Sequence, residues 1–164
     1  MPTSSPIASP TTSATASPSQ DLYLHYATNG ESYYTDIRIE AGTLTYTYFS
    51  DDENRCAQWF KSEPCWSDAD LKTITHPLDN QSETALRQLV TDSGILSLGA
   101  ELLGAQNPKQ RAYSEKLEVR LGNDERQLVY RSRPDAPAKP EPFRQLEEAL
   151  QQQAQQLLQN QTSQ

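Results

Sequence analysis

The chain has few residues whose type and spacing suggest chemistry, and the clearest pair is Cys56 and Cys65. They are its only two cysteines, and both lie in the polar stretch Ser50–Asp70. An even cysteine count with close spacing, in a chain that we expect to be exported, favours a disulfide. A zinc site with His25 or His76 is an alternative, but the spacing does not match a paired-cysteine knuckle and a fourth ligand is missing.

Other catalytic patterns are weaker still. His25 alternates within a predicted strand and His76 precedes a proline, so both histidines are interpreted as structural or solvated. An activated Cys56 thiol beside His25 is an alternative, but the nearby Cys65 favours the inert disulfide. The acidic run Asp51-Asp52-Glu53 lacks the alternating ligands and central glycine of a calcium loop. Phosphate-binding and nucleophile-elbow motifs do not occur, so we predict a non-enzyme without metal, cofactor or small-molecule substrate.

Three large aromatic residues, Trp59, Phe60 and Trp66, surround the two cysteines. Aromatic rings supply much contact area at low entropy cost and are enriched at interface hot spots. We therefore predict that these three residues bind a partner protein. The alternative is that they fold back to cover the open end of a small core.

The polar stretch with the cysteines and the aromatic residues follows a predicted hairpin at residues 33–49. Apolar or aromatic residues alternate with polar ones in both of its arms, and the Ala41-Gly42 corner tolerates positive φ. Residues 21–27 alternate in the same way, and the turn pair Asn29-Gly30 joins them to the hairpin. The sequence thus predicts a three-stranded meander.

Four further elements follow. Patterns of spacing, capping and turns predict a strand at residues 71–76, a helix that Ser82 caps and Gly94 ends, a hairpin of residues 113–121 and 127–131, and a terminal helix with Pro142 in its first turn. An apolar cluster at residues 95–103 is left without an element. The predicted fold class is α+β, with an antiparallel sheet of about four to six strands (a meander plus a C-terminal hairpin) and two helices packed on one face.

Composition divides the chain into three parts. Residues 1–20 carry no charged side chain and are rich in Ser, Thr and Pro, which predicts a disordered tether. Residues 21–150 form the single predicted domain. Residues 151–164 are a glutamine-rich helical extension with too little apolar content to pack firmly, and its last residues are expected to fray.

Charge and hydropathy narrow the class of partner. The net charge of −8 argues against nucleic acid, which rewards clustered Lys and Arg. No apolar run approaches the ~20 residues that cross a bilayer, so no transmembrane segment is predicted. Such tethers often follow a removed signal or a lipid anchor in bacterial exported proteins, which predicts an extracytoplasmic location: periplasm, lumen or cell surface.

The segments SETALRQLVTDSGIL, YSEKLEVRL, RQLVYR and FRQLEEAL, in this order behind a Tyr-rich strand, resemble the small bacterial emfourin-like domains of protease-inhibitor type. The resemblance spans about residues 22–150, although the family pattern lacks the insertion at residues 50–70. It implies an antiparallel sheet with helices on one face and a non-catalytic role in binding another protein.

Two functions are therefore expected. The first is a non-catalytic, exported or membrane-tethered accessory domain that binds another protein, as a subunit or assembly factor of a larger complex. The second, which only the resemblance implies, is a stoichiometric protein inhibitor of a protease.

Overall fold

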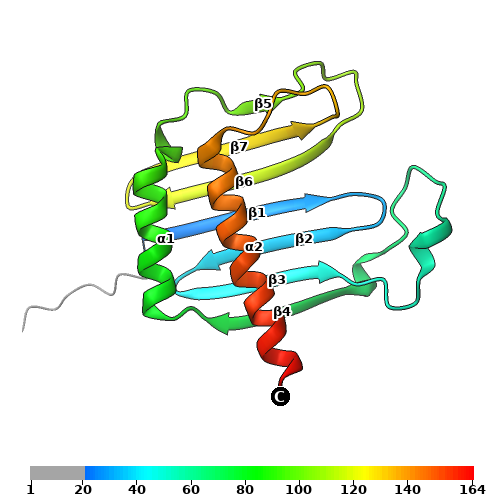
Figure 1. The fold of residues 1–164 in the computed structure, drawn as a ribbon, viewed down its shortest axis with the longest axis horizontal. Coiled ribbons are helices and arrows are strands. Elements are labelled where there is room, and N and C mark those ends of the chain that lie inside the picture. The colour runs from blue at the N-terminus through cyan, green and yellow to red at the C-terminus, as the bar shows by residue number, and fades with distance from the viewer. Residues whose placement is uncertain (1–20) are drawn as a thin grey trace, which may run out of the picture.

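A computed structural model describes residues 21–164 and shows an α+β fold of two helices and one seven-stranded sheet (Figure 1). The prediction of a tether at residues 1–20 lies outside the described residues. The strands are β1 (Leu22–Asn29), β2 (Tyr34–Glu40), β3 (Thr43–Phe49), β4 (Leu71–Pro77), β5 (Leu102–Gly104), β6 (Tyr113–Leu121) and β7 (Asp124–Ser132), and the helices are α1 (Asn80–Ser93) and α2 (Glu141–Thr162). Short 3-10 turns cover Arg55–Gln58, Asp68–Asp70 and Ile95–Ser97.

The sheet has the strand order β4-β3-β2-β1-β6-β7-β5, so β1 lies at its centre. All neighbours pair antiparallel except β5 and β7, which are parallel. The predicted meander is present as β1, β2 and β3, and the predicted C-terminal hairpin as β6 and β7. The meander and the C-terminal hairpin are joined into one sheet by the pairing of β1 with β6, which are far apart in sequence. In this pairing Leu24 lies opposite Val119 and Ala27 lies opposite Lys116.

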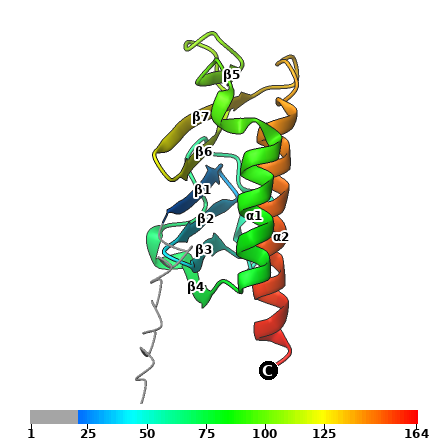
Figure 2. The same cartoon turned by 90° about the vertical axis from the view of Figure 1, so that its left-hand side faces the viewer.

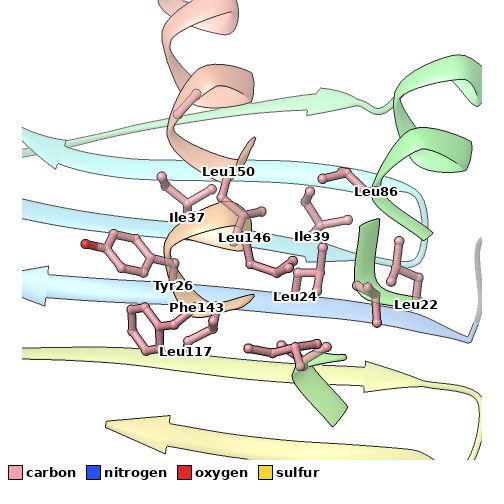
Figure 3. Close-up of a cluster of buried hydrophobic side chains, with 14 of the residues drawn as sticks. Leu22, Leu24, Tyr26, Ile37, Ile39, Leu86, Leu117, Phe143, Leu146 and Leu150 are labelled. Atoms are coloured by element: carbon pink, nitrogen blue, oxygen red, sulfur yellow. The ribbon is translucent and has the colours of Figure 1, made fainter. Parts of the chain in front are cut away.

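Both helices lie on the same side of the sheet (Figure 2). The strands direct alternate side chains toward this side, and these form one buried cluster with apolar residues of α1 and α2 (Figure 3). The largest fully buried members include Leu24, Tyr26, Ile37, Leu117, Phe143, Leu146 and Leu150. The strand residues between them, such as His25, Arg38 and Glu118, point to the opposite side, which we call the open face.

The sheet has seven strands, one more than the predicted range of four to six. The additional strand is β5, which begins at the end of the cluster at residues 95–103, for which the sequence predicted no element. Its three residues are too few for a side-chain repeat to be visible in the sequence, and its pairing with β7 depends on a partner almost thirty positions away. Gly104 ends β5 with φ of 76°, where a side chain would collide with the carbonyl oxygen of Arg131.

Helix α1 begins three residues before the predicted start. Asp79 is the N-cap, and its carboxylate accepts hydrogen bonds from the Ser82 amide and the Ser82 hydroxyl, each at 2.8 Å. These bonds hold the pKa of Asp79 below its usual range. Gly94 ends the helix in the left-handed conformation, as predicted.

Helix α2 departs from the prediction that residues beyond Gln151 pack weakly. It continues to Thr162, and Ala154 and Leu157 are only 2% and 5% exposed in the same core cluster. Three apolar residues spaced one helical turn apart, Leu150, Ala154 and Leu157, are enough to keep this face of the helix on the sheet. The core therefore extends beyond residue 150, the predicted end of the domain.

The connections divide between the two ends of the sheet (Figure 1). One end carries the tight hairpin turns β2–β3 and β6–β7 and the start of β1, where the Gly122 amide donates to the Asp21 carbonyl at 2.9 Å. The other end carries the long connections β3–β4, β5–β6 and β7–α2. We call it the loop end.

Candidate interaction site

The β3–β4 connection, residues 50–67, is a flap closed by the Cys56–Cys65 disulfide, which confirms the predicted pairing. Before the bridge, the Asp51 carboxylate accepts from the amides of Arg55 and Cys56, at 2.8 and 2.9 Å. A bridge over a loop of this length stabilises the folded state by roughly 2–3 kcal/mol in the chain-entropy account. Because both sulfurs are joined to each other, neither supplies a zinc ligand or an activated thiol.

The flap is tied to the turn between β1 and β2. The Cys65 amide donates to the Glu31 carbonyl at 2.8 Å, and the Trp66 indole donates to the Gly30 carbonyl at 3.0 Å. The Trp66 ring also meets the Tyr34 ring edge-on, with centroids 5.0 Å apart. Trp66 therefore fixes the base of the flap.

The other two aromatic residues lie farther out. Trp59 is half-buried, with its indole donating to the Glu63 carbonyl at 2.7 Å and the Lys61 ammonium 5.2 Å from its ring centre. Phe60 is 94% exposed. The structure thus separates the predicted trio: Trp66 packs, Trp59 supports the outer flap, and only Phe60 presents a whole ring to solvent.

A notch of about 520 Å³ lies between the flap and the rest of the loop end. Its lining comes from the end of β1 and the following turn (residues 27–31), from Ser62 and Pro64 of the flap, and from residues 111–116. Ala27 and Lys116, which are cross-strand neighbours, place the notch on the open face. Three segments far apart in sequence therefore meet here.

Glu31 joins these segments. Its carboxylate pairs with the Arg111 guanidinium and accepts from the Tyr113 hydroxyl at 2.8 Å, while its own carbonyl holds the flap. Arg133, the residue after β7, donates from its guanidinium to the Arg111 carbonyl at 2.8 Å. This bond holds the segment before β6 from the other side.

The β5–β6 loop is held in place by hydrogen bonds from Arg131 of the neighbouring strand β7. The Arg131 guanidinium donates to the carbonyls of Ala105, Asn107 and Gln110, at 3.2, 2.8 and 2.7 Å. One planar guanidinium thereby supplies hydrogen bonds to three carbonyls of a loop that lies outside the strand pairing of the sheet. Lys109 lies at the exposed tip of this loop.

The two histidines are not brought together. His25 lies on the open face, with Nε2 2.9 Å from the Asp36 carboxylate and Nδ1 3.7 Å from the Glu118 carboxylate. His76 is exposed on β4, its Nδ1 2.6 Å from the Pro77 carbonyl oxygen. Within residues 21–164 no group of three or more His, Cys, Asp or Glu side chains is placed to hold a metal ion. Neither helix of that region is long and apolar enough to cross a membrane.

A polar cluster is buried where α2 crosses the sheet. The Tyr26 hydroxyl lies 3.0 Å from a carboxylate oxygen of both Glu115 and Glu147, and the Lys139 ammonium contacts the same two carboxylates. Burial, together with the two carboxylates, raises the pKa of Tyr26 well above its usual range. Burial lowers the pKa of Lys139, but the carboxylates outweigh it and the pKa lies above its ordinary value.

Sequence reasoning found the flap but missed the notch. Glu31, Arg111 and Lys116 carry no motif, and only the pairing of β1 with β6 brings them together. The order of the predicted strands alone does not specify that pairing, so no local signal could have found the notch.

Comparison with known proteins gave no match, either to a protein-family model or to a curated protein.

Proposed function

We propose that this protein is a non-catalytic, exported or membrane-tethered accessory domain that binds another protein through the flap. The observation that carries the proposal is Phe60, which is 94% exposed at the outer part of a disulfide-closed loop. The other exposed large hydrophobic side chains of residues 21–164 are Tyr33, Leu102 and Tyr113, and each of them is less than half as exposed as Phe60. An exposed ring on a braced loop offers contact area with little ordering cost on binding.

The bracing of the flap supports this proposal. The disulfide, the Asp51 carboxylate and the two bonds to the β1–β2 turn all restrict the flap before any partner arrives. A preordered loop loses less conformational entropy on association than a flexible one. The Cys56–Cys65 bridge is also compatible with an extracytoplasmic compartment, where disulfides persist.

A second candidate is a stoichiometric protein inhibitor of a protease, to which the resemblance to emfourin-like domains points. One observation favours it: the β5–β6 loop is held by three bonds from Arg131 and lies at the same end of the sheet as the flap. Rigid projecting loops suit occupation of a concave partner site.

The test is a pull-down of the full chain from its native compartment under non-reducing conditions, with the retained proteins quantified. We expect Phe60→Ser to lower partner recovery by at least about tenfold, since truncation of a hot-spot residue costs about 2 kcal/mol or more. Leu102→Ser is the matched control, because Leu102 is 42% exposed on β5, away from the flap. Equal recovery with Phe60→Ser and the unaltered chain would overturn the proposal.

The two candidates differ in one measurement. An inhibitor mixed at one-to-one stoichiometry with the retained protein lowers that protein's proteolytic activity, and Phe60→Ser or a change in the β5–β6 loop relieves the inhibition. An accessory domain co-purifies with a larger assembly and leaves proteolysis unchanged.

A further inference from the structure

We infer that the notch receives an extended segment of the partner protein that carries an acidic side chain, with Lys116 as the residue that pairs with it. The inference rests on the proposed function, because it concerns the same end of the molecule and names the chemistry of the partner there.

The charge of the notch is opposite to that of the chain. The whole chain carries a formal charge of −8, yet the charged residues lining the notch are one acid, Glu31, and two bases, Arg111 and Lys116. Glu31 is already engaged by Arg111 and by the Tyr113 hydroxyl. The remaining charge of the lining is therefore positive.

That positive charge is the ammonium of Lys116, and the described part of the chain supplies it with no ion pair. The nearby acids have other partners: Glu31 pairs with Arg111, and Glu115, which points to the helix side, pairs with Lys139. Glu118, two positions farther along β6 on the open face, lies 3.7 Å from His25 Nδ1. In the sheet register Lys116 lies between Ala27 of β1 and Val129 of β7. Both cross-strand neighbours are uncharged, so neither of them supplies a carboxylate for Lys116.

The size and the other lining groups suit a peptide segment. A volume of about 520 Å³ falls within the range of pockets that enclose small ligands or a few residues. The side chains of Asn29, Ser62 and Ser114 also line the notch and can hydrogen-bond a peptide backbone. The flap that presents Phe60 forms one wall, so a segment in the notch continues the surface on which the ring lies.

The probes for the test are three short peptides titrated into the isotopically labelled full chain and followed by backbone amide NMR shifts. The first is acetyl-Gly-Asp-Gly-amide, the second its Asn analogue, and the third the Asn analogue with a free C-terminal carboxylate. We expect saturable shifts at Ala27, Asn29 and Lys116 with the Asp peptide at up to about 10 mM, weakened by salt. Equal binding of the Asn amide, or no saturable shift with any peptide, would overturn the inference.

Two variants sharpen the test. Lys116→Gln should weaken the Asp peptide by about fivefold, the upper end for an exposed ion pair. Lys109→Gln, at the tip of the neighbouring loop and outside the notch, should leave it unchanged. Tighter binding of the peptide with the free C-terminus than of the Asp peptide would overturn the assignment to an acidic side chain.

The outcomes separate this inference from the proposed function. Loss of partner recovery with Phe60→Ser, combined with an unselective peptide response, leaves the flap as the binding surface and removes the acidic segment. A selective response to the Asp peptide, combined with full recovery for Phe60→Ser, removes the flap as the docking surface but keeps the notch as a carboxylate site.

Discussion

The Lys139 ammonium lies 2.6 Å from a carboxylate oxygen of Glu147 in α2, and this pair closes the polar cluster beneath the helix. Lys139 belongs to the proline-rich connector that follows β7, so the pair fixes the point at which the chain enters α2. The Lys139 side chain also lies over the rings of Tyr130 and Phe143, with its ammonium 5.5 and 5.9 Å from their centres. One cation thereby joins the connector, the helix and the core.

Replacing Lys139 by Met should lower the free energy of unfolding by roughly 2–4 kcal/mol. The change leaves the carboxylates of Glu115 and Glu147 facing each other across Tyr26 without their cation, and breaking a fully buried pair costs about 3–5 kcal/mol. The expected loss of unfolding free energy is smaller than for a fully buried pair because the Lys139 side chain is 22% exposed. Urea denaturation measures it, with Lys109→Met at an exposed loop tip as the control; equal stability of the two variants would contradict the prediction.

Stability should fall as the pH rises above about 10. The ordinary pKa of Tyr26 is 10.0 and that of Lys139 is 10.5, and both are raised in the folded protein. Between the unfolded and the folded pKa the native state holds more protons, so the free energy of unfolding decreases with pH, by at most ~1.4 kcal/mol per unit for each group. Below the unfolded pKa values this contribution is fully present.

The measurement for that dependence is urea denaturation at a series of pH values from neutral to alkaline. Tyr26→Phe removes one of the groups whose pKa is raised, so its curve should be flatter than that of the unaltered chain above pH 10. Tyr23, Tyr34 and Tyr46, whose pKa values burial also raises, titrate in both proteins and cancel in the comparison. A steeper or identical alkaline dependence in Tyr26→Phe would show that the phenol does not titrate as described.

Gly104→Ala should destabilise the protein by at least about 2 kcal/mol. The residue has φ of 76° and its added methyl group would meet the carbonyl oxygen of Arg131, so both backbone strain and a steric clash oppose the change. Gly99→Ala is the matched control, because a side chain at Gly99 meets nothing within 4 Å. Thermal or urea unfolding compares the two, and a similar loss in both would contradict the close approach of β5 to β7.

Leu157→Ala should cost about 2–3 kcal/mol of unfolding free energy, the lower part of the range for buried leucines because the site is near the end of α2. Leu157 is 5% exposed, whereas its neighbour Gln156 is exposed and serves as the control in Gln156→Ala. A neutral Leu157→Ala would restore the prediction that the glutamine-rich tail packs weakly.

The elements that the sequence predicts well have local signals. Strands β1 to β3 show side-chain alternation over seven or eight residues, and Ala41-Gly42 marks the β2–β3 turn. Gly122-Asn123 marks the turn of the β6–β7 hairpin in the same way. The disulfide follows from the cysteine count. These features need no knowledge of which distant segments touch.

Features that depend on distant contacts were missed. Strand β5 exists because Leu102 and Leu103 pair with Val129 and Tyr130. The polar cluster links Tyr26 with Glu147, 121 positions away. The start of α1 was missed for a local reason. Asp79 and Ser82 are both good N-cap residues, and the sequence does not show that Asp79 is the one that caps the helix.

The position of Asp21 beside the β6–β7 hairpin has a consequence for how the molecule is displayed. The central strand β1 runs from there to the flap, about 25 Å at the usual rise per residue. The first described residue therefore lies at the end of the sheet that carries the two hairpin turns. The flap with Phe60 and the notch with Lys116 lie at the opposite end, so the entry of the chain into β1 leaves both of them unobstructed.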